Sequence, residues 1–282
     1  METSKKVTDS LRREIKKYNI MGMMYVRGSG SPFGRHKQRC FWDLCGKPML
    51  QWSLEAGLAS KYINKVVLSS EDMKILQFGA EMKGVTVIPR PLHMTLELPR
   101  DFNAGVFKRQ LPRSLFAGEP FRDPECRHFA EVGKASPIWY SCWYMEEHEG
   151  YAPQIWVNLA ANEPLATVET LDSLIEAFFL DEEANRAYTI YPIMPYIVSI
   201  NPKTGQLFPI VHYDGLDKQS YPDIYRMGPY IVWGKPLKTT FNATFRAAWI
   251  IIPKEQAIDI HDEDDLILAN HYLERRLTEE KK

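Results

Sequence analysis

The stretch that decides the fold is Ile20-Met21-Gly22-Met23-Met24-Tyr25-Val26, followed by Arg27-Gly28-Ser29-Gly30-Ser31-Pro32-Phe33-Gly34. The first part is a short apolar run of the kind that forms a buried strand. The second part is a glycine-rich loop, where backbone N–H groups can approach a phosphate because side chains are absent. The spacing is neither GxGxxG nor GxxxxGK[ST], so the loop by itself does not distinguish a nucleotide cradle from a structural turn.

Basic side chains surround these glycines. Arg27, Arg35, Lys37 and Arg39 lie in or just after the loop, and Gly46-Lys47-Pro48 follows. This concentration of positive charge could neutralise a triphosphate. The alternative is a solvated basic loop that binds nothing.

Helical and strand-like segments alternate after the loop. Leu50, Leu54 and Leu58 share one helical face, and 65–70 is the next apolar strand. Helices are also expected near 73–82, 137–147 and 170–179, with strands at 85–88 and 154–159. Such alternation predicts an α/β protein built from βαβ units.

The rest of the chain suggests three additions to this domain. Residues 1–19 predict an amphipathic helical extension, and 20–282 form the main domain. Residues 91–135 have no clear period and read as an insertion, for which we expect a lid or a border of the acceptor side of the site. Strand and turn signals after residue 188 predict a β-rich subdomain with hairpins, and a charged helix is expected over 262–277.

Composition excludes several classes of protein. The chain has 282 residues with 35 Lys+Arg against 36 Asp+Glu, so no extended basic face for nucleic acid is implied. No apolar run approaches the ~20 residues that cross a bilayer, and the basic N-terminus lacks the apolar core of a secretory signal. We therefore expect a cytoplasmic protein without membrane contact. The four cysteines never form CxxC or CxxH, which argues against a zinc site or a disulfide framework.

Five motifs, in order, resemble those of the acylneuraminate and 3-deoxy-manno-octulosonate (KDO) cytidylyltransferases. The similarity covers most of the chain, although the loop after the first strand is longer here. The motifs are 27–37 with 44–56, 65–72, 157–165, then Lys218-Gln219 with Pro222 and 225–228, and finally Ile258-Asp259-Ile260-His261-Asp262-Glu263-Asp264-Asp265-Leu266.

The resemblance implies a Rossmann-like nucleotidyltransferase (GT-A-like) mixed sheet flanked by helices, with a small β-rich dimerisation subdomain at about 186–246 and a homodimer. It implies transfer of CMP from CTP to an acidic sugar, with release of pyrophosphate. Arg27, Lys37 and Arg39 are then the candidate catalytic cations, and the assignment between Lys37 and Arg39 stays open. The implied nucleotide-binding residues are Arg27, Gly28, Ser29, Gly30, Ser69 and Asn162, and the implied acceptor-binding residues are Lys218, Gln219, Tyr225 and Arg226.

The resemblance also implies a divalent ion, Mg²⁺ or another such as Mn²⁺, with Asp259 and His261 as its candidate ligands. Two positions where the family has carboxylates are Asn162 and His261 here, so we expect weaker use of magnesium and a preference shifted towards manganese or cobalt. Two alternatives remain open. His261 could simply hydrogen-bond near the sheet end, or a one-residue slip could bring Asp262 into the ligand position.

Two other functions remain alternatives. A nucleotidyltransferase of the same fold could act on a phosphonate, a sugar phosphate or methylerythritol phosphate, because acceptor pockets are built from variable loops. The altered metal positions also allow a catalytically weak nucleotide-binding protein.

Overall fold

The computed structural model describes residues 7–28, 38–90, 137–194, 197–201, 203–210, 223–234 and 247–280. Its helices are α1 (Asp9–Ile15), η1 (Arg39–Phe41), α2 (Met49–Ala59), α3 (Met73–Glu81), α6 (Pro137–Glu149), α7 (Val168–Leu180), η5 (Lys254–Ala257) and α8 (Glu263–Glu279). Its strands are β1 (Ile20–Tyr25), β2 (Asp43–Leu44), β3 (Lys47–Pro48), β4 (Lys65–Ser70), β5 (Val85–Pro89), β6 (Ile155–Asn158), β7 (Arg186–Ile193), β8 (Val198–Ile200), β9 (Leu207–Pro209), β10 (Ile224–Gly234) and β11 (Ala247–Ile251).

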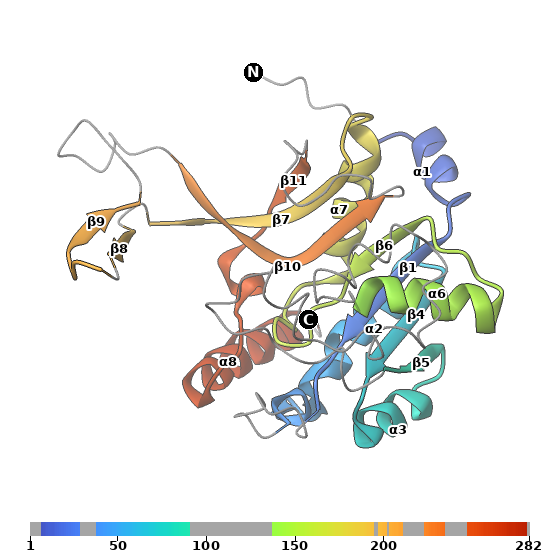
Figure 1. Ribbon diagram of the computed structural model, residues 1–282, viewed down its shortest axis with the longest axis horizontal. Helices are drawn as coiled ribbons and strands as arrows, with labels where there is room; N and C mark the ends of the chain where they lie inside the picture. The colour runs from blue at the N-terminus through green and yellow to red at the C-terminus, as the bar shows by residue number, and fades with distance from the viewer. Residues whose placement is uncertain are drawn as a thin grey trace.

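A seven-stranded sheet organises the molecule, in the order β11-β7-β10-β6-β1-β4-β5. β10 runs antiparallel to β6 and β7, while the other neighbouring pairs run parallel. The chain leaves β1 through α2 towards β4 and β5, and later returns to the other side of β1 as β6 (Figure 1). The prediction of an α/β protein with a mixed sheet and flanking helices is therefore confirmed.

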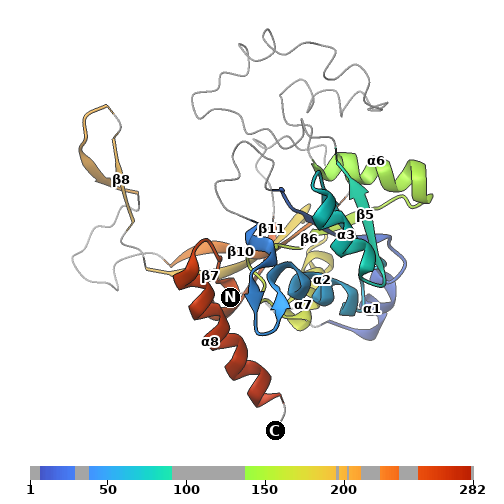
Figure 2. The same cartoon turned by 90° about the horizontal axis from the view of Figure 1, so that it is seen from below.

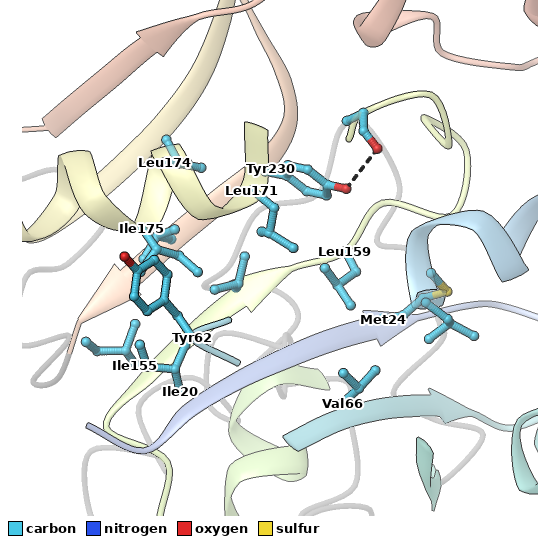
Figure 3. Packing of buried hydrophobic residues seen from close by; sticks show 14 of the residues in the cluster. Ile20, Met24, Tyr62, Val66, Ile155, Leu159, Leu171, Leu174, Ile175 and Tyr230 are labelled. Carbon is cyan, nitrogen blue, oxygen red and sulfur yellow. Dashed lines mark hydrogen bonds between the residues drawn. The ribbon is translucent and has the colours of Figure 1, made fainter. Parts of the chain in front are cut away.

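The side chains of β1 alternate between two packing layers. Met21 and Met23 face a cluster that includes Tyr140 and Met145 of α6. Ile20 and Met24 face the opposite layer, which the apolar side of α7 covers (Figure 3). This alternation follows from the period of two along a strand, and burial of both faces explains why the run is almost wholly apolar.

The N-terminal helix α1 packs against the same layer. Ile15 is fully buried in it, and the ring of Tyr18 lies edge-on to Phe179, with ring centroids 4.9 Å apart. Thr8 caps the helix by accepting a hydrogen bond from the Leu11 amide. The predicted extension is therefore docked on the domain through an apolar face.

The predicted β-rich subdomain at 186–246 contains two different parts. The long strands β7 and β10 lie within the main sheet, where they pair with each other. Among the described residues of this span, β8 and β9 form a separate two-stranded sheet, and this hairpin projects away from the main body (Figures 1 and 2). Cross-strand pairing joins β7 and β10 to β6 and β11, so these two strands belong to the main sheet.

Several expectations concern other parts of the chain. The insertion at 91–135 lies outside the described residues. None of the helices in the described ranges is both long enough and apolar enough to cross a membrane. Among the described residues, Cys40, Cys45 and Cys142 form no disulfide, and Cys126 is not described.

Candidate functional site

The candidate residues gather at the carboxyl ends of the parallel strands. Arg27 and Gly28 follow β1, Glu71 follows β4, and Asn162 lies shortly after β6. Because the chain crosses from β1 to opposite sides of the sheet, the position between β1 and β6 is a topological switch point. In open α/β sheets this crevice is where ligands bind.

A buried ion pair fixes the start of the glycine-rich loop. The Gly28 amide donates to Glu71 Oε1 at 2.7 Å, and Arg90 donates to Glu71 Oε2, also at 2.7 Å. Arg90 also donates to the carbonyl of Val26 at 2.9 Å. Both charged side chains are almost completely buried, so each charge is compensated by the other. The Gly28 amide, predicted to reach a phosphate, is thus already occupied by a carboxylate.

Gly28 is required for a steric reason. A Cβ atom at this position would lie 2.3 Å from Asp72 Cβ, which is closer than real Cβ atoms approach. Asp72 cannot easily move away, because its side chain caps α3 by accepting from the Lys74 amide. The first glycine of the loop therefore permits close packing against α3.

The Gly46-Lys47-Pro48 motif forms a hairpin. Cys45 and Gly46 have φ of 50° and 85° at the turn between β2 and β3, as a two-residue hairpin turn with positive φ requires. Lys47 Nζ lies 2.7 Å from Glu55 and over the ring of Trp52. This hairpin leads directly into α2, and its lysine is engaged by two residues of that helix.

A second polar cluster, which we call the Asp259 cluster, joins β6, β10, η1 and the segment before α8. Asp259 Oδ1 accepts from the side-chain amide of Asn162, and Asp259 Oδ2 lies 2.8 Å from His261 Nε2 and 3.5 Å from the Arg226 guanidinium. Arg39 donates to the His261 carbonyl, and its guanidinium lies 3.3 Å from His261 Nδ1. The Ile260 amide donates to the Asn162 carbonyl at 2.8 Å, which fixes the two segments together.

These contacts surround the His261 ring on both sides. A neutral ring would accept from Arg39 at Nδ1 and donate to Asp259 from Nε2. Both ring nitrogens thus lie against protein groups, and the role of His261 as a metal ligand stays a prediction. Asp262, the ligand in the slipped alternative, caps α8 by accepting from the Asp265 amide.

Glu163 is a second carboxyl group near this cluster. Burial raises the pKa of Glu163 to about 7, with a further contribution from the charge of Asp259, while Arg226 acts in the opposite direction. Ionising both carboxyl groups together is unfavourable because their charges repel. Glu163 is therefore a group whose charge changes near neutral pH.

The Asp259 cluster does not fit the divalent ion that the resemblance implies. Magnesium prefers several oxygen ligands in a near-octahedral shell. Here the carboxylate of Asp259 is bound by an amide, an imidazole and a guanidinium, and positive side chains flank it. Over the described residues, no group of three or more His, Cys, Asp or Glu side chains could hold a metal ion.

The structure brings together some predicted site residues and separates others. Arg39, Asn162, Arg226, Asp259 and His261 meet in the Asp259 cluster. Arg27 is exposed at the end of β1, and Ser69 is fully buried within β4. Tyr225 is exposed on β10, where neighbouring residues point to opposite faces, so it does not join Arg226. Ser29, Gly30, Lys37, Lys218 and Gln219 lie outside the described residues.

Sequence reasoning missed Glu71, Arg90 and Glu163. Glu71 and Arg90 each follow an apolar strand directly, and Glu163 follows β6 within a short loop. A charged residue immediately after a parallel strand was the available signal. Their pairing was not visible, because it depends on which strands are neighbours.

A cavity of about 320 Å³ adjoins the Asp259 cluster. Arg226 and Lys254 supply positive charge to its wall, and Asp259 and Asp265 supply negative charge. Pockets for small molecules typically combine apolar walls with a few polar groups that orient the ligand. This cavity therefore offers groups of both charges to a small polar compound.

Comparison with known proteins identifies the fold. No protein-family model matches the chain, and no curated protein sequence matches it. A CMP:2-keto-3-deoxy-manno-octonic acid synthetase solved in complex with CTP superposes with a TM-score of 0.55 at 13% identity, over 92% of this chain and 99% of that one. A 4-diphosphocytidyl-2C-methyl-D-erythritol synthase from Anaerococcus prevotii gives 0.51 at 13% identity, over 91% and 99%. The chain therefore has the fold of CTP-dependent cytidylyltransferases.

Proposed function

We propose that this protein is a cytidylyltransferase that transfers CMP from CTP to an acidic sugar, or to an acceptor resembling a sugar acid. The observation that carries the proposal is the Asp259 cluster, which holds two arginines at the carboxyl end of a sheet with the cytidylyltransferase fold. Arginine forks match phosphate and carboxylate oxygens, so the cluster suits anionic substrates.

The proposed reaction is attack of an acceptor hydroxyl oxygen on the α-phosphorus of CTP. The new oxygen–phosphorus bond replaces the bond to pyrophosphate, which leaves, and the hydroxyl proton passes to solvent or to a nearby base. Alignment and charge neutralisation provide most of the catalysis in such transfers. Arg27 would bind the triphosphate together with the loop residues Ser29 and Gly30, and Asn162 and Ser69 would lie on the nucleotide side.

For the catalytic role left open between Lys37 and Arg39, the position of Arg39 supports its assignment, while Lys37 lies outside the described residues. The Arg39 guanidinium is held beside His261, within a cluster that also contains Arg226. Lys37 would contribute from the preceding loop. A cation fixed by hydrogen bonds needs less reorganisation when charge develops on the transferring phosphate.

The acceptor would occupy the cavity beside the Asp259 cluster. Arg226 supports this placement because it lines the cavity and also contacts Asp259. Lys218 and Gln219 are proposed to contact the acceptor from the same region of the chain, whereas Tyr225 lies on the opposite face of β10 from Arg226. Residues 91–135 are proposed to border it, because their many arginines suit recognition of a carboxylate or phosphonate.

We also propose a homodimer formed through the projecting hairpin. Val198 and Ile200 of β8 and Leu207 of β9 are exposed, and so is Met194 just before them. Contiguous exposed apolar side chains commonly mark an interaction surface. Sedimentation of the full chain would show a dimer, and a monomer at high protein concentration would contradict this part of the proposal.

Calorimetry and a product assay test the function. The full chain should bind CTP more tightly than UTP or ATP. It should then release pyrophosphate with at least one member of a panel of sugar acids, phosphonates and sugar phosphates. If pyrophosphate were released only with phosphonates or sugar phosphates, the acceptor would belong to one of those classes and not to the acidic sugars. Absence of CTP binding would refute the proposal.

Arg27→Ala provides a residue-level prediction for the triphosphate. Loss of one charge-assisted contact is worth about 1.5 to 3 kcal/mol, so CTP affinity should fall by that amount. Arg13→Ala is the matched control, because Arg13 is an exposed arginine on α1. Equal CTP affinities in both variants and the wild type would remove Arg27 from the site.

One set of observations favours a second candidate function, a catalytically weak nucleotide-binding protein. The Gly28 amide is occupied by Glu71, and the oxygens of Asp259 are occupied by Asn162, His261 and Arg226. Saturable CTP binding without pyrophosphate release across the whole panel would establish this candidate instead.

A further inference from the structure

Asp259 is bound to protein donors through both carboxylate oxygens. Oδ1 accepts from Asn162, and Oδ2 lies near both His261 Nε2 and Arg226. Its side chain is 17% exposed, so water provides little competition for these contacts. A metal ion could use this carboxylate only if some of these contacts were broken.

His261 extends the same network to a second arginine. Its ring and its backbone carbonyl both face Arg39 of η1, while Arg226 reaches Asp259 from β10. The His261 amide donates to Asp265 Oδ2 at 2.9 Å, which fixes the backbone of this residue. Arg226 thus contacts the Asp259 carboxylate directly, and Arg39 is linked to it through His261.

We infer that the arginine pair Arg39 and Arg226 supplies the positive charge that a protein-bound divalent ion would otherwise supply here, and that Asp259 and His261 position this pair. The inference rests on the proposed function, because the anion concerned is the triphosphate of CTP. The two guanidinium groups offset the carboxylate charges of Asp259 and Asp265, which weakens the attraction for a dication, and their planar forks match phosphate oxygens. Any magnesium that CTP brings would then be held by the nucleotide alone.

Metal binding to the full chain provides the first test. Electron paramagnetic resonance should show no saturable site when Mn²⁺ is titrated into the wild-type protein. The variant Asn162→Asp with His261→Asp should gain a site, because it adds two carboxylates beside Asp259. A saturable Mn²⁺ site in the wild type that disappears in Asp259→Asn would overturn the inference.

CTP binding in the absence of metal provides the second test. The wild type should bind CTP in EDTA, and Arg39→Ala and Arg226→Ala should each lower that affinity about 10- to 100-fold. Arg39→Lys and Arg226→Lys should recover part of the loss, since they keep the charge without the fork. Exposed Arg13→Ala is the control, and thermal unfolding confirms that each variant is folded.

The outcomes separate the inference from the proposed function. CTP binding that requires Mg²⁺, and that is unchanged in both arginine variants, contradicts the arginine pair and leaves the proposed function intact. No CTP binding in either buffer contradicts the proposed function itself. CTP binding in EDTA that depends on both arginines supports the inference, whether or not an acceptor has been found.

Discussion

At the scale of single residues, Gly28 shows that a glycine in a phosphate-type loop can be required for packing. The glycine was expected to expose its amide to a phosphate, yet the amide donates to Glu71 and the missing side chain leaves room for Asp72. Gly28→Ala should therefore destabilise the fold by about 1 to 3 kcal/mol through overpacking. Chemical denaturation of the purified variant measures this free energy.

A second substitution identifies the clash. Asp72→Gly removes the Cβ that the methyl group added by Gly28→Ala would meet, and glycine is tolerated at a helix N-cap. Asp72→Ala keeps that Cβ. Gly28→Ala should therefore lower the free energy of unfolding less in the Asp72→Gly background than in the Asp72→Ala background. A double-mutant cycle measures this difference. Equal costs in both backgrounds would show that Asp72 is not the obstacle.

Glu163 provides a pH-dependent prediction. Burial raises the pKa of Glu163 from 4.5 to about 7, so the folded state binds this proton more tightly than the unfolded state. The folding free energy that protonated Glu163 contributes is fully present below its unfolded-state pKa of 4.5. It is lost as pH rises through its folded-state pKa of about 7. Glu163→Gln should therefore stabilise the protein at pH 8 relative to pH 5, on the order of 1 to 3 kcal/mol. A pH-independent effect in denaturant titrations would contradict the raised pKa.

At the scale of elements, the sequence was informative wherever burial imposes a period. The apolar run of β1 and the spacing of Leu50 and Leu54 on α2 predicted both elements correctly. The pairing of β7 with β10 was missed, because residues between them separate the two strands in the chain. A strand's own residues indicate that it will pair but do not specify its partner, so the place of β7 and β10 in the main sheet could not be predicted from the sequence.

The N-terminal helix α1 is expected to contribute to the stability of the whole domain. Ile15 is fully buried against the layer under α7. Ile15→Ala should destabilise the protein by about 2 to 5 kcal/mol, as for other large-to-small changes in a core. Exposed Glu14→Ala on the same helix is the control. If thermal unfolding gave both variants the wild-type midpoint, α1 would be a dispensable appendage.

At the scale of the whole molecule, the candidate site depends on contacts between distant segments. The family resemblance singled out Asn162, Arg226 and Asp259, and the structure brings these three residues together. The occupation of Asp259 by Asn162, His261 and Arg226 could not be predicted from the sequence, because hydrogen-bond partners depend on side-chain geometry across four segments. The same reason hid the buried pair of Glu71 and Arg90.

The central claim is transfer of CMP from CTP to an acidic acceptor. The most direct measurement follows the label of CTP carrying radioactive phosphorus at the α position, with the full chain and a panel of sugar acids. The account predicts that the label appears in a new acidic product, in an amount equal to the pyrophosphate released, and that UTP and ATP are poor substitutes. Label that remains in CTP, or is released only as free CMP with every acceptor, would contradict it.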